Sequence, residues 1–450
     1  MDNQTICAPA SAPVQSALAV IRISGPDAVA VVRRIFSHPE RIKQRRAAYG
    51  WILDGDARVD DVVCTCFTAP HSFTGEDTVE ISCHGNPLIV QNIITLLQRD
   101  TSVRIAQPGE FTRRAFKNGK IDLTAAQAVD AIIRARSSWE ISTALRQMHG
   151  SLRTEIDSMR SRLIELRADV EAAIDFSEEH IEFVSREEIT DAVGVIGEQL
   201  SLVLQRCRTG ERIAQGLSIA IVGKPNAGKS SILNYIVNEE RAIVSDIPGT
   251  TRDLVRETVQ LNGIHLNLID TAGIRYSEDA VEKIGIQRSR EAVEKAHIVL
   301  AVLDLTTGIT DEDRNIFSIL PEDRVIFLLN KSDIADSVII SESDLPARSI
   351  LFSARTGEGF AKLEEAITAM MHLGLEERDQ SFLADTRIIA ALEKSKSLCG
   401  VLAESAASGN PEEIVASDIQ ELLDTLQEIT GEVTTDDVLE SIFSRFCIGK

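Results

Sequence analysis

Gly223-Lys-Pro-Asn-Ala-Gly-Lys-Ser230 decides the fold of the central part of this chain. It matches the pattern GxxxxGK[ST] and stands between the apolar run LSIAIV (217–222) and a segment that reads as a helix. Glycines let backbone N–H groups wrap phosphate oxygens, and the N-terminus of a following helix adds positive potential. We therefore predict a nucleotide-binding α/β domain in which Lys229 reaches the β- and γ-phosphates and the Ser230 hydroxyl binds Mg²⁺.

The segments around this loop have the sequence pattern of a parallel β-sheet with intervening helices. Apolar, β-branched-rich runs alternate with helical stretches from residue 217 to about 372. The runs are LSIAIV (217–222), IHLNLI (264–269), IVLAVLD (298–304), VIFLL (325–329) and SILF (349–352). Continuous apolar runs separated by helices indicate a mostly parallel, buried sheet.

Three further motifs follow predicted strands and point to guanine. Asp270-Thr-Ala-Gly273 suits a metal-side carboxylate and a glycine that senses the γ-phosphate, and Thr251 in DIPGTTRD is expected to complete the Mg²⁺ shell. A carboxylate in Asn330-Lys-Ser-Asp333 can accept hydrogen bonds from guanine N1–H and N2–H₂, a donor pair that adenine lacks. Ser353-Ala354 would complete the base pocket. The predicted GTP contacts are Asn226, Ala227, Gly228, Lys229, Ser230, Ser231, Ser245, Asp246, Ile247, Pro248, Gly249, Thr250, Thr251, Asp270, Thr271, Ala272, Gly273, Asn330, Lys331, Asp333, Ser353 and Ala354.

Ile274 occupies the position after Asp270-Thr-Ala-Gly273, where Ras-like enzymes place a glutamine that orients the attacking water. Isoleucine cannot do this, so another polar group must position the water; Glu278, Asp279 and Glu282 lie close by in sequence. Asn226, inside the phosphate loop, is a spare oxygen ligand. A monovalent cation held there would supply the positive charge that an arginine finger otherwise provides.

The flanking segments show two other sequence patterns, one typical of an α+β domain and one typical of helices. Residues 1 to about 118 contain short apolar runs, such as AVIRISG (19–25) and TVEISCHG (78–85), that read as strands of an α+β domain. Residues 120–210 and those after 380 read as helical. We predict that the two helical segments pack together, so that the α/β domain is an insertion between two halves of one helical domain. One helix carries a seam with alternating spacings of four and three, which indicates an intramolecular bundle or, as the alternative, a dimer interface. The seam residues are Leu152, Ile156, Met159, Leu163, Leu166, Val170 and Ala173.

Composition narrows the class of protein. The formal charge of 47 − 69 = −22 over 450 residues argues against diffuse nucleic-acid binding and leaves two local basic segments, 41–46 and Arg113-Arg114. Each is read first as a solvated surface and second as a nucleic-acid contact. No apolar run approaches the roughly 20 residues that span a bilayer, and no leader pattern is visible, so the cytoplasm is expected. The seven cysteines form no CxxC pair, which argues against structural zinc or a disulfide framework. Cys64 and Cys66 should share one face of a strand.

These blocks together resemble the MnmE (TrmE) family of tRNA-modifying GTPases over essentially the full length. Beyond the GTPase motifs, the matching stretches are IRISG (21–25), HSFTGEDTVEISCHG (71–85), QPGEFTRRAFKNGKIDL (107–123), EKIGIQRS (282–289) and ITGEVTTDDVLESIFSRFCIGK (429–450). Departures from the family pattern are APVQSALA (12–19), His84-Gly85-Asn86 and Thr386-Arg387.

The resemblance implies a multidomain α/β and α architecture. It comprises an N-terminal α+β domain (1–118) that binds folate and dimerises, a split helical domain (119–212 and 376–450) and an inserted Ras-like P-loop GTPase domain (213–375). It also implies a homodimer that, with an FAD-dependent partner in a heterotetramer, adds an aminomethyl-type group to C5 of the wobble uridine, position 34, of certain tRNAs. The one-carbon unit would come from 5-formyl-tetrahydrofolate or a related folate.

The resemblance also assigns residues. K⁺, entering when two GTPase domains meet, would be held by Asn226, Ser245, Ile247 and Thr250. Glu282 would orient the water. The folate contacts carry over to Arg22, Glu80, Lys120 and Lys450, and Cys447 matches a functional cysteine of the family.

Two alternatives belong to other functional classes. One is a GTP-controlled assembly factor that binds ribosomal RNA without chemistry, which would need neither a Cys447 tail nor a folate-type block. The other is a folate-dependent one-carbon enzyme merely regulated by GTP, which would not need the complete GTPase insertion.

Overall fold

The computed structural model describes residues 4–176, 184–239, 256–261, 264–270, 293–294, 296–334, 346, 348–370 and 380–450. The chain divides into two compact units. One comprises Met1–Arg134, Leu145–Leu200 and Ala390–Lys450, and the other Ala135–Ala144 and Ser201–Ile389. This two-part division differs from the four domain ranges given above, which stay a prediction.

The first unit begins with an α+β layer. A six-stranded sheet of order β3-β4-β5-β2-β1-β6 carries α1 and α2 on one face, where their apolar residues share a core with the strands. Cys64 and Cys66 on β4 both point into this core, as predicted. The elements are β1 (Thr5–Pro9), β2 (Leu18–Ser24), α1 (Ala28–Ile35), η1 (Pro39–Arg41), β3 (Ala47–Asp54), β4 (Ala57–Phe67), β5 (Thr78–His84), α2 (Pro87–Gln98), β6 (Val103–Ile105) and α3 (Glu110–Lys117).

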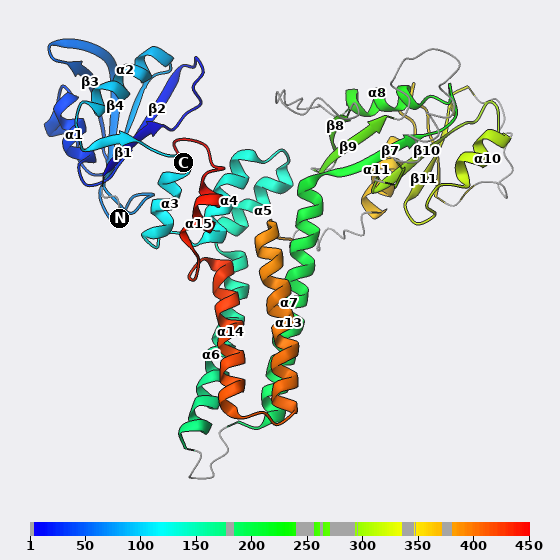
Figure 1. The fold of residues 1–450 in the computed structure, drawn as a ribbon. Helices are drawn as coiled ribbons and strands as arrows, with labels where there is room; N and C mark the ends of the chain where they lie inside the picture. The colour runs from blue at the N-terminus through cyan, green and yellow to red at the C-terminus, as the bar shows by residue number, and fades with distance from the viewer. Residues whose placement is uncertain are drawn as a thin grey trace. The chain divides into compact units, whose positions relative to one another are not determined.

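Helices from both ends of the chain form the rest of the first unit. The predicted seam lies on α6 (Ser151–Asp175), which packs along α14 (Glu412–Thr430) (Figure 1). Six seam residues, from Leu152 to Val170, are buried and Ala173 is half-buried. The seam is thus internal to one chain, which confirms the split helical arrangement. A smaller core joins α4 (Leu123–Arg134) to α15 (Asp436–Phe443) through Leu123 and Phe443.

Three of the described helices contribute residues to both units. They are α5 (Ser138–Met148), α7 (Arg186–Gln215) and α13 (Thr386–Ala407). None of the described helices combines the length and apolarity needed to cross a membrane.

The second unit contains the predicted buried sheet, of order β12-β11-β10-β7-β9-β8. Every strand pair is parallel except β8 with β9, and apolar cores lie on both faces. The elements are β7 (Leu217–Val222), α8 (Lys229–Glu239), β8 (Arg256–Leu261), β9 (Ile264–Asp270), β10 (Ile298–Asp304), α10 (Asp311–Phe317), β11 (Val325–Asn330), β12 (Ser349–Leu351) and α11 (Phe360–Met370). The α/β plus α architecture inferred from the sequence is confirmed.

Candidate functional site

The phosphate loop connects β7 to the first residue of α8, Lys229. Three of its residues have a positive φ, Gly223 at 153°, Asn226 at 62° and Gly228 at 100°. A Cβ on Gly228 would lie 2.1 Å from Asn330 Nδ2, so only glycine fits against the neighbouring loop. Lys229 Nζ donates to the carbonyls of Gly223 (2.7 Å) and Lys224 (2.8 Å), which holds the ammonium over the loop. The turn therefore presents backbone N–H groups and one cation at a helix N-terminus, the geometry that binds phosphate.

Two more predicted motifs meet this loop at the carboxyl ends of β11 and β12. Asn330 is buried; its Nδ2 donates to Ala227 O at 2.9 Å, and its Oδ1 accepts from Ala354 N at 3.2 Å. Ser353 Oγ donates to Asp333 Oδ1 at 2.7 Å, which fixes the carboxylate that would face a base. Three stretches far apart in sequence thus converge at one edge of the sheet, where ligands of open α/β sheets bind.

Two ion pairs that sequence reasoning did not identify brace this edge. Lys224 Nζ lies 3.0 Å from Asp313 Oδ2 and 2.8 Å from Thr307 Oγ1. Lys331 Nζ lies 2.6 Å from Asp304 Oδ2 at the end of β10. Burial raises the pKa of Asp304, but hydrogen bonds from Lys331 and Thr306 outweigh it and leave that pKa below its usual value. These partners are scattered along the chain, so no local pattern marks them.

Part of the predicted nucleotide site lies outside the described residues. Asp270 ends β9, while its side chain is not described. The predicted site residues outside the described ranges are Ser245, Asp246, Ile247, Pro248, Gly249, Thr250, Thr251, Thr271, Ala272, Gly273 and Glu282.

The predicted folate residues lie in the first unit, on the sheet and the chain terminus. Arg22 on β2 is directly opposite Glu80 on β5, and its Nε donates to Glu80 Oε1 at 2.9 Å. The Arg22 guanidinium also lies 5.6 Å from the centre of the Phe73 ring, within cation–π range. Lys120 Nζ donates to Pro70 O at 2.9 Å, so it contacts the loop that carries Phe73.

The C-terminal tail is fixed against β1. Gly449 has φ 95°, and a Cβ there would lie 2.0 Å from Pro9 O, so the tail's penultimate position requires glycine. Gly449 O lies 3.4 Å from an Arg22 nitrogen. Burial lowers the pKa of Lys450 and Arg22 lowers it further, while Glu80 and Cys447 act in the opposite direction. Arg22 therefore contacts the residue before Lys450, and the Lys450 N–H donates to Cys447 O at 3.3 Å, so the exposed Cys447 lies in the same short turn of the tail.

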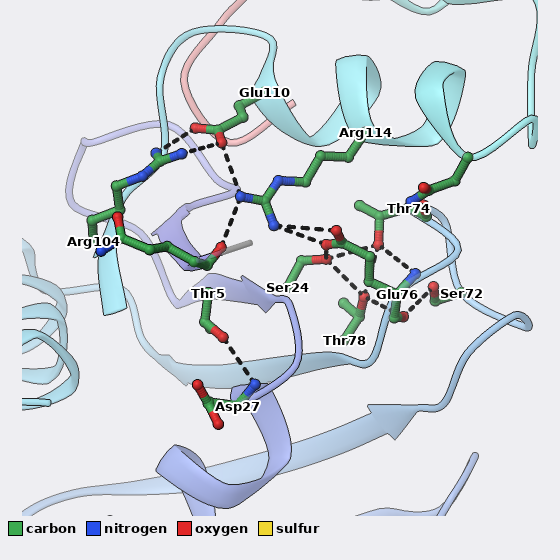
Figure 2. Close-up of polar contacts among 12 residues, drawn as sticks. Thr5, Ser24, Asp27, Ser72, Thr74, Glu76, Thr78, Arg104, Glu110 and Arg114 are labelled. Atoms are coloured by element: carbon green, nitrogen blue, oxygen red, sulfur yellow. Dashed lines mark hydrogen bonds and ion pairs between the residues drawn. The ribbon is translucent and has the colours of Figure 1, made fainter. Parts of the chain in front are cut away.

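A second polar network attaches α3 to β6 and to the loop before β5 (Figure 2). Glu110 accepts from Arg104 at 2.6 Å and from Arg114 at 3.0 Å, and Arg114 reaches Glu76 at 3.0 Å. Burial raises the pKa of Glu110, but hydrogen bonds from Arg104, the Gln107 N–H and Arg114 outweigh it and lower that pKa. Arg114 is therefore no surface cation, contrary to its treatment as part of a basic segment. Its spacing of four from Glu110 on one helix was the available signal.

Comparison with known families covers nearly the whole chain. The family model described as "GTP-binding protein TrmE N-terminus" matches residues 5–120, and the one described as "MnmE helical domain" matches residues 123–447.

The sequence is similar to those of curated relatives along nearly their full length. The tRNA modification GTPase MnmE of Thermotoga maritima is 39% identical over 99% of this chain and 100% of its own. That of Aquifex aeolicus is 40% identical over 97% of both. Among solved structures, the G domain of the T. maritima FeoB iron transporter matches 34% of this chain and 98% of its own at 25% identity, with a TM-score of 0.27. Taken with the phosphate loop and guanine-type motifs, these matches show that the chain belongs to the MnmE (TrmE) family of tRNA modification GTPases.

Proposed function

We propose that this GTPase acts in the cytoplasm with an FAD-dependent partner to place an aminomethyl or carboxymethylaminomethyl group on C5 of the wobble uridine of certain tRNAs. The carbon would come from 5-formyl-tetrahydrofolate or a related one-carbon folate. The observation that carries the proposal is the cluster of Arg22, Glu80, Cys447 and Lys450 on the first unit. It brings the tail that carries the exposed Cys447 to an arginine and a carboxylate on neighbouring strands.

The chemistry of this cluster fits a folate. Arginine and lysine side chains suit the glutamyl carboxylate of such a carrier, and the Glu80 carboxylate can accept hydrogen bonds from a pterin edge. The exposed Phe73 ring, whose centre lies 5.6 Å from the Arg22 guanidinium, adds flat apolar surface. A bound folate would supply a one-carbon unit; the chain's own groups bind and orient it.

The second unit supplies the GTPase part of the proposal. Ser230, exposed in the first turn of α8, has a hydroxyl suited to Mg²⁺, and Thr251 would complete the shell. Asn226 is exposed in the phosphate loop and offers an amide oxygen to K⁺, which Ser245, Ile247 and Thr250 would complete with backbone carbonyls. Glu282 would orient the attacking water. We propose that K⁺ enters when two such domains face each other, so that hydrolysis depends on homodimerisation.

Nucleoside mass spectrometry of tRNA tests the proposal. Cells lacking the gene should lose the C5-modified wobble uridine, and the wild-type chain should restore it. The Cys447→Ser variant should fail to restore it, whereas Ser444→Ala, a matched change at an exposed residue of the same tail, should succeed. Unaltered wobble uridine in the deletion strain would overturn the proposal, and full restoration by Cys447→Ser would remove its chemical role.

A further inference from the structure

Residues 41–46, here called the basic segment, display four cations on the α+β layer. Arg41, Lys43, Arg45 and Arg46 are all exposed, whereas Ile42 between them is buried in the core with 1% of its surface accessible. One apolar residue therefore anchors the segment while its cationic neighbours face solvent.

The backbone of the basic segment is held in place from several sides. An Arg33 nitrogen donates to Ile42 O at 3.0 Å, and Arg45 N donates to Cys66 O at 2.7 Å. Gln44 forms a bridge with Cys66, and Arg46 N donates to Lys43 O at 3.2 Å. The cations thus project from a fixed backbone, which lowers the ordering cost of binding an extended polyanion.

Few acidic groups neutralise these cations. Arg41 lies 3.7 Å from Glu40, while Lys43, Arg45 and Arg46 form no ion pair with any residue in the described ranges. By contrast, both arginines of the other basic stretch form ion pairs within the chain. Arg113 pairs with Asp436, and Arg114 pairs with Glu76 and Glu110.

The local charge balance is opposite to that of the whole chain. The basic segment contains four cations and no acid, a charge of +4, so the remainder of the chain carries −22 − 4 = −26. Most of such a molecule repels an anionic polymer, whereas the basic segment attracts it. This difference orients the polymer toward the basic segment.

We propose that the basic segment binds the phosphate backbone of tRNA. The identity of this RNA rests on the proposed function; the phosphate chemistry rests on the uncompensated cations. Lysine and arginine contacts to phosphates release counterions, so affinity should fall steeply with salt and show little dependence on base sequence.

The test uses the full chain and a fluorescently labelled tRNA transcript, with binding followed by anisotropy across a series of salt concentrations. Lys43→Glu/Arg46→Glu should weaken binding about tenfold or more at low salt and reduce the slope of log affinity against log salt by about 2. Arg162→Glu/Lys396→Glu is the matched control. It also changes the charge by four at two exposed helix residues without ion pairs in the described part of the chain, and it should stay close to wild type. Thermal unfolding at the wild-type temperature confirms that both variants are folded.

Equal loss of affinity in both variants would show that only net charge matters and would overturn the inference. Wild-type tRNA affinity of Lys43→Glu/Arg46→Glu would also overturn the inference. If that variant bound tRNA normally but lost tRNA modification in cells, the basic segment would contact an acidic protein and not the RNA. Specific loss of binding in vitro would uphold the inference even if the deletion strain kept its wobble modification, so the two proposals fail separately.

Discussion

Lys224 in the phosphate loop and Asp313 in the first turn of α10 form a nearly buried ion pair, with 11% and 1% of their side-chain surfaces exposed. Asp313 also accepts from Thr310 N at 2.9 Å and Thr310 Oγ1 at 2.6 Å, so its carboxylate is fixed by the helix cap. Since the Lys224 carbonyl accepts from Lys229 Nζ, the pair links the α10 cap to the lysine expected on the β- and γ-phosphates.

Lys224→Met should therefore weaken the binding of GDP and GTP alike, by about tenfold, which corresponds to about 1.4 kcal/mol. It should also destabilise the second unit by about 3 kcal/mol, because breaking a buried pair leaves one charge uncompensated. Fluorescent-nucleotide titration measures the first effect and calorimetric unfolding of the full chain the second.

Lys362→Met, at an exposed lysine of α11, serves as the control and should change neither quantity. Adding Asp313→Asn to Lys224→Met should recover part of the stability, because no charge is then stranded. Lower stability with unchanged nucleotide affinity would show that the pair supports the fold without positioning the loop.

Asn226 allows a second prediction, because its φ of 62° is a conformation that asparagine and glycine adopt more readily than other residues. Asn226→Gly should keep the loop's backbone and remove only the amide oxygen. In the wild type, replacing Na⁺ by K⁺ should raise the rate of GTP hydrolysis severalfold, and in Asn226→Gly that stimulation should disappear while GDP affinity stays within about twofold.

Asn226→Ala separates the two effects of this position. It removes the same oxygen but strains the left-handed backbone, so it should lose GDP affinity as well. A wild-type rate of GTP hydrolysis that is the same in Na⁺ and K⁺ would rule out the cation site. K⁺ stimulation that persists in Asn226→Gly would mean that other ligands hold the cation.

The meeting of Asn330 and Ser353 with the phosphate loop could be predicted from sequence because each of these three motifs directly follows a continuous apolar run. Parallel strands align their carboxyl ends, so Asn330 and Ser353 had to meet the phosphate loop once β7, β11 and β12 were recognised. The strand β8 was missed. Its sequence, RETVQL, alternates in polarity because it lies at the sheet edge and pairs antiparallel with β9.

Contacts between distant segments could not be predicted in this way. No periodicity indicates that Gly449 packs against Pro9, or that Lys224 pairs with Asp313, because partners so far apart in sequence leave no local pattern. At Arg114 a local pattern was present but was misread. The adjacent Arg113 suggested a solvated basic surface, whereas Glu110, four residues earlier on the same helix, is the ion-pair partner of Arg114.

Asp333 should determine the choice of base. Its carboxylate, held by Ser353, can accept from guanine N1–H and N2–H₂, whereas an amide in its place offers one donor. Asp333→Asn should therefore weaken GTP binding by about a hundredfold and strengthen XTP binding, because xanthine has a carbonyl where guanine has its amino group. Competition titrations with the two nucleotides measure the change. Asp323→Asn, at an exposed acid before β11, should keep the preference for GTP. Retained GTP selectivity in Asp333→Asn would contradict the assignment.

Thiol reactivity should single out Cys447. Burial raises the pKa of the Cys64 and Cys207 thiols to about 12 and those of Cys7, Cys83 and Cys399 to about 11; it raises the pKa of Cys66 as well. A raised thiol pKa leaves little reactive thiolate at pH 8, and burial also blocks access. The remaining cysteine, Cys447, is exposed.

Brief treatment of the native chain with iodoacetamide at pH 8 should thus modify one thiol, identified by peptide mass mapping as Cys447, and all seven should react in denaturant. The Cys447→Ser variant should show no fast-reacting thiol in the native state. Rapid labelling of Cys64 or Cys207 in the folded chain would contradict the burial on which the prediction rests. A slow Cys447 would mean that the tail shields its sulfur, and a direct chemical role in tRNA modification would then require the tail to move first.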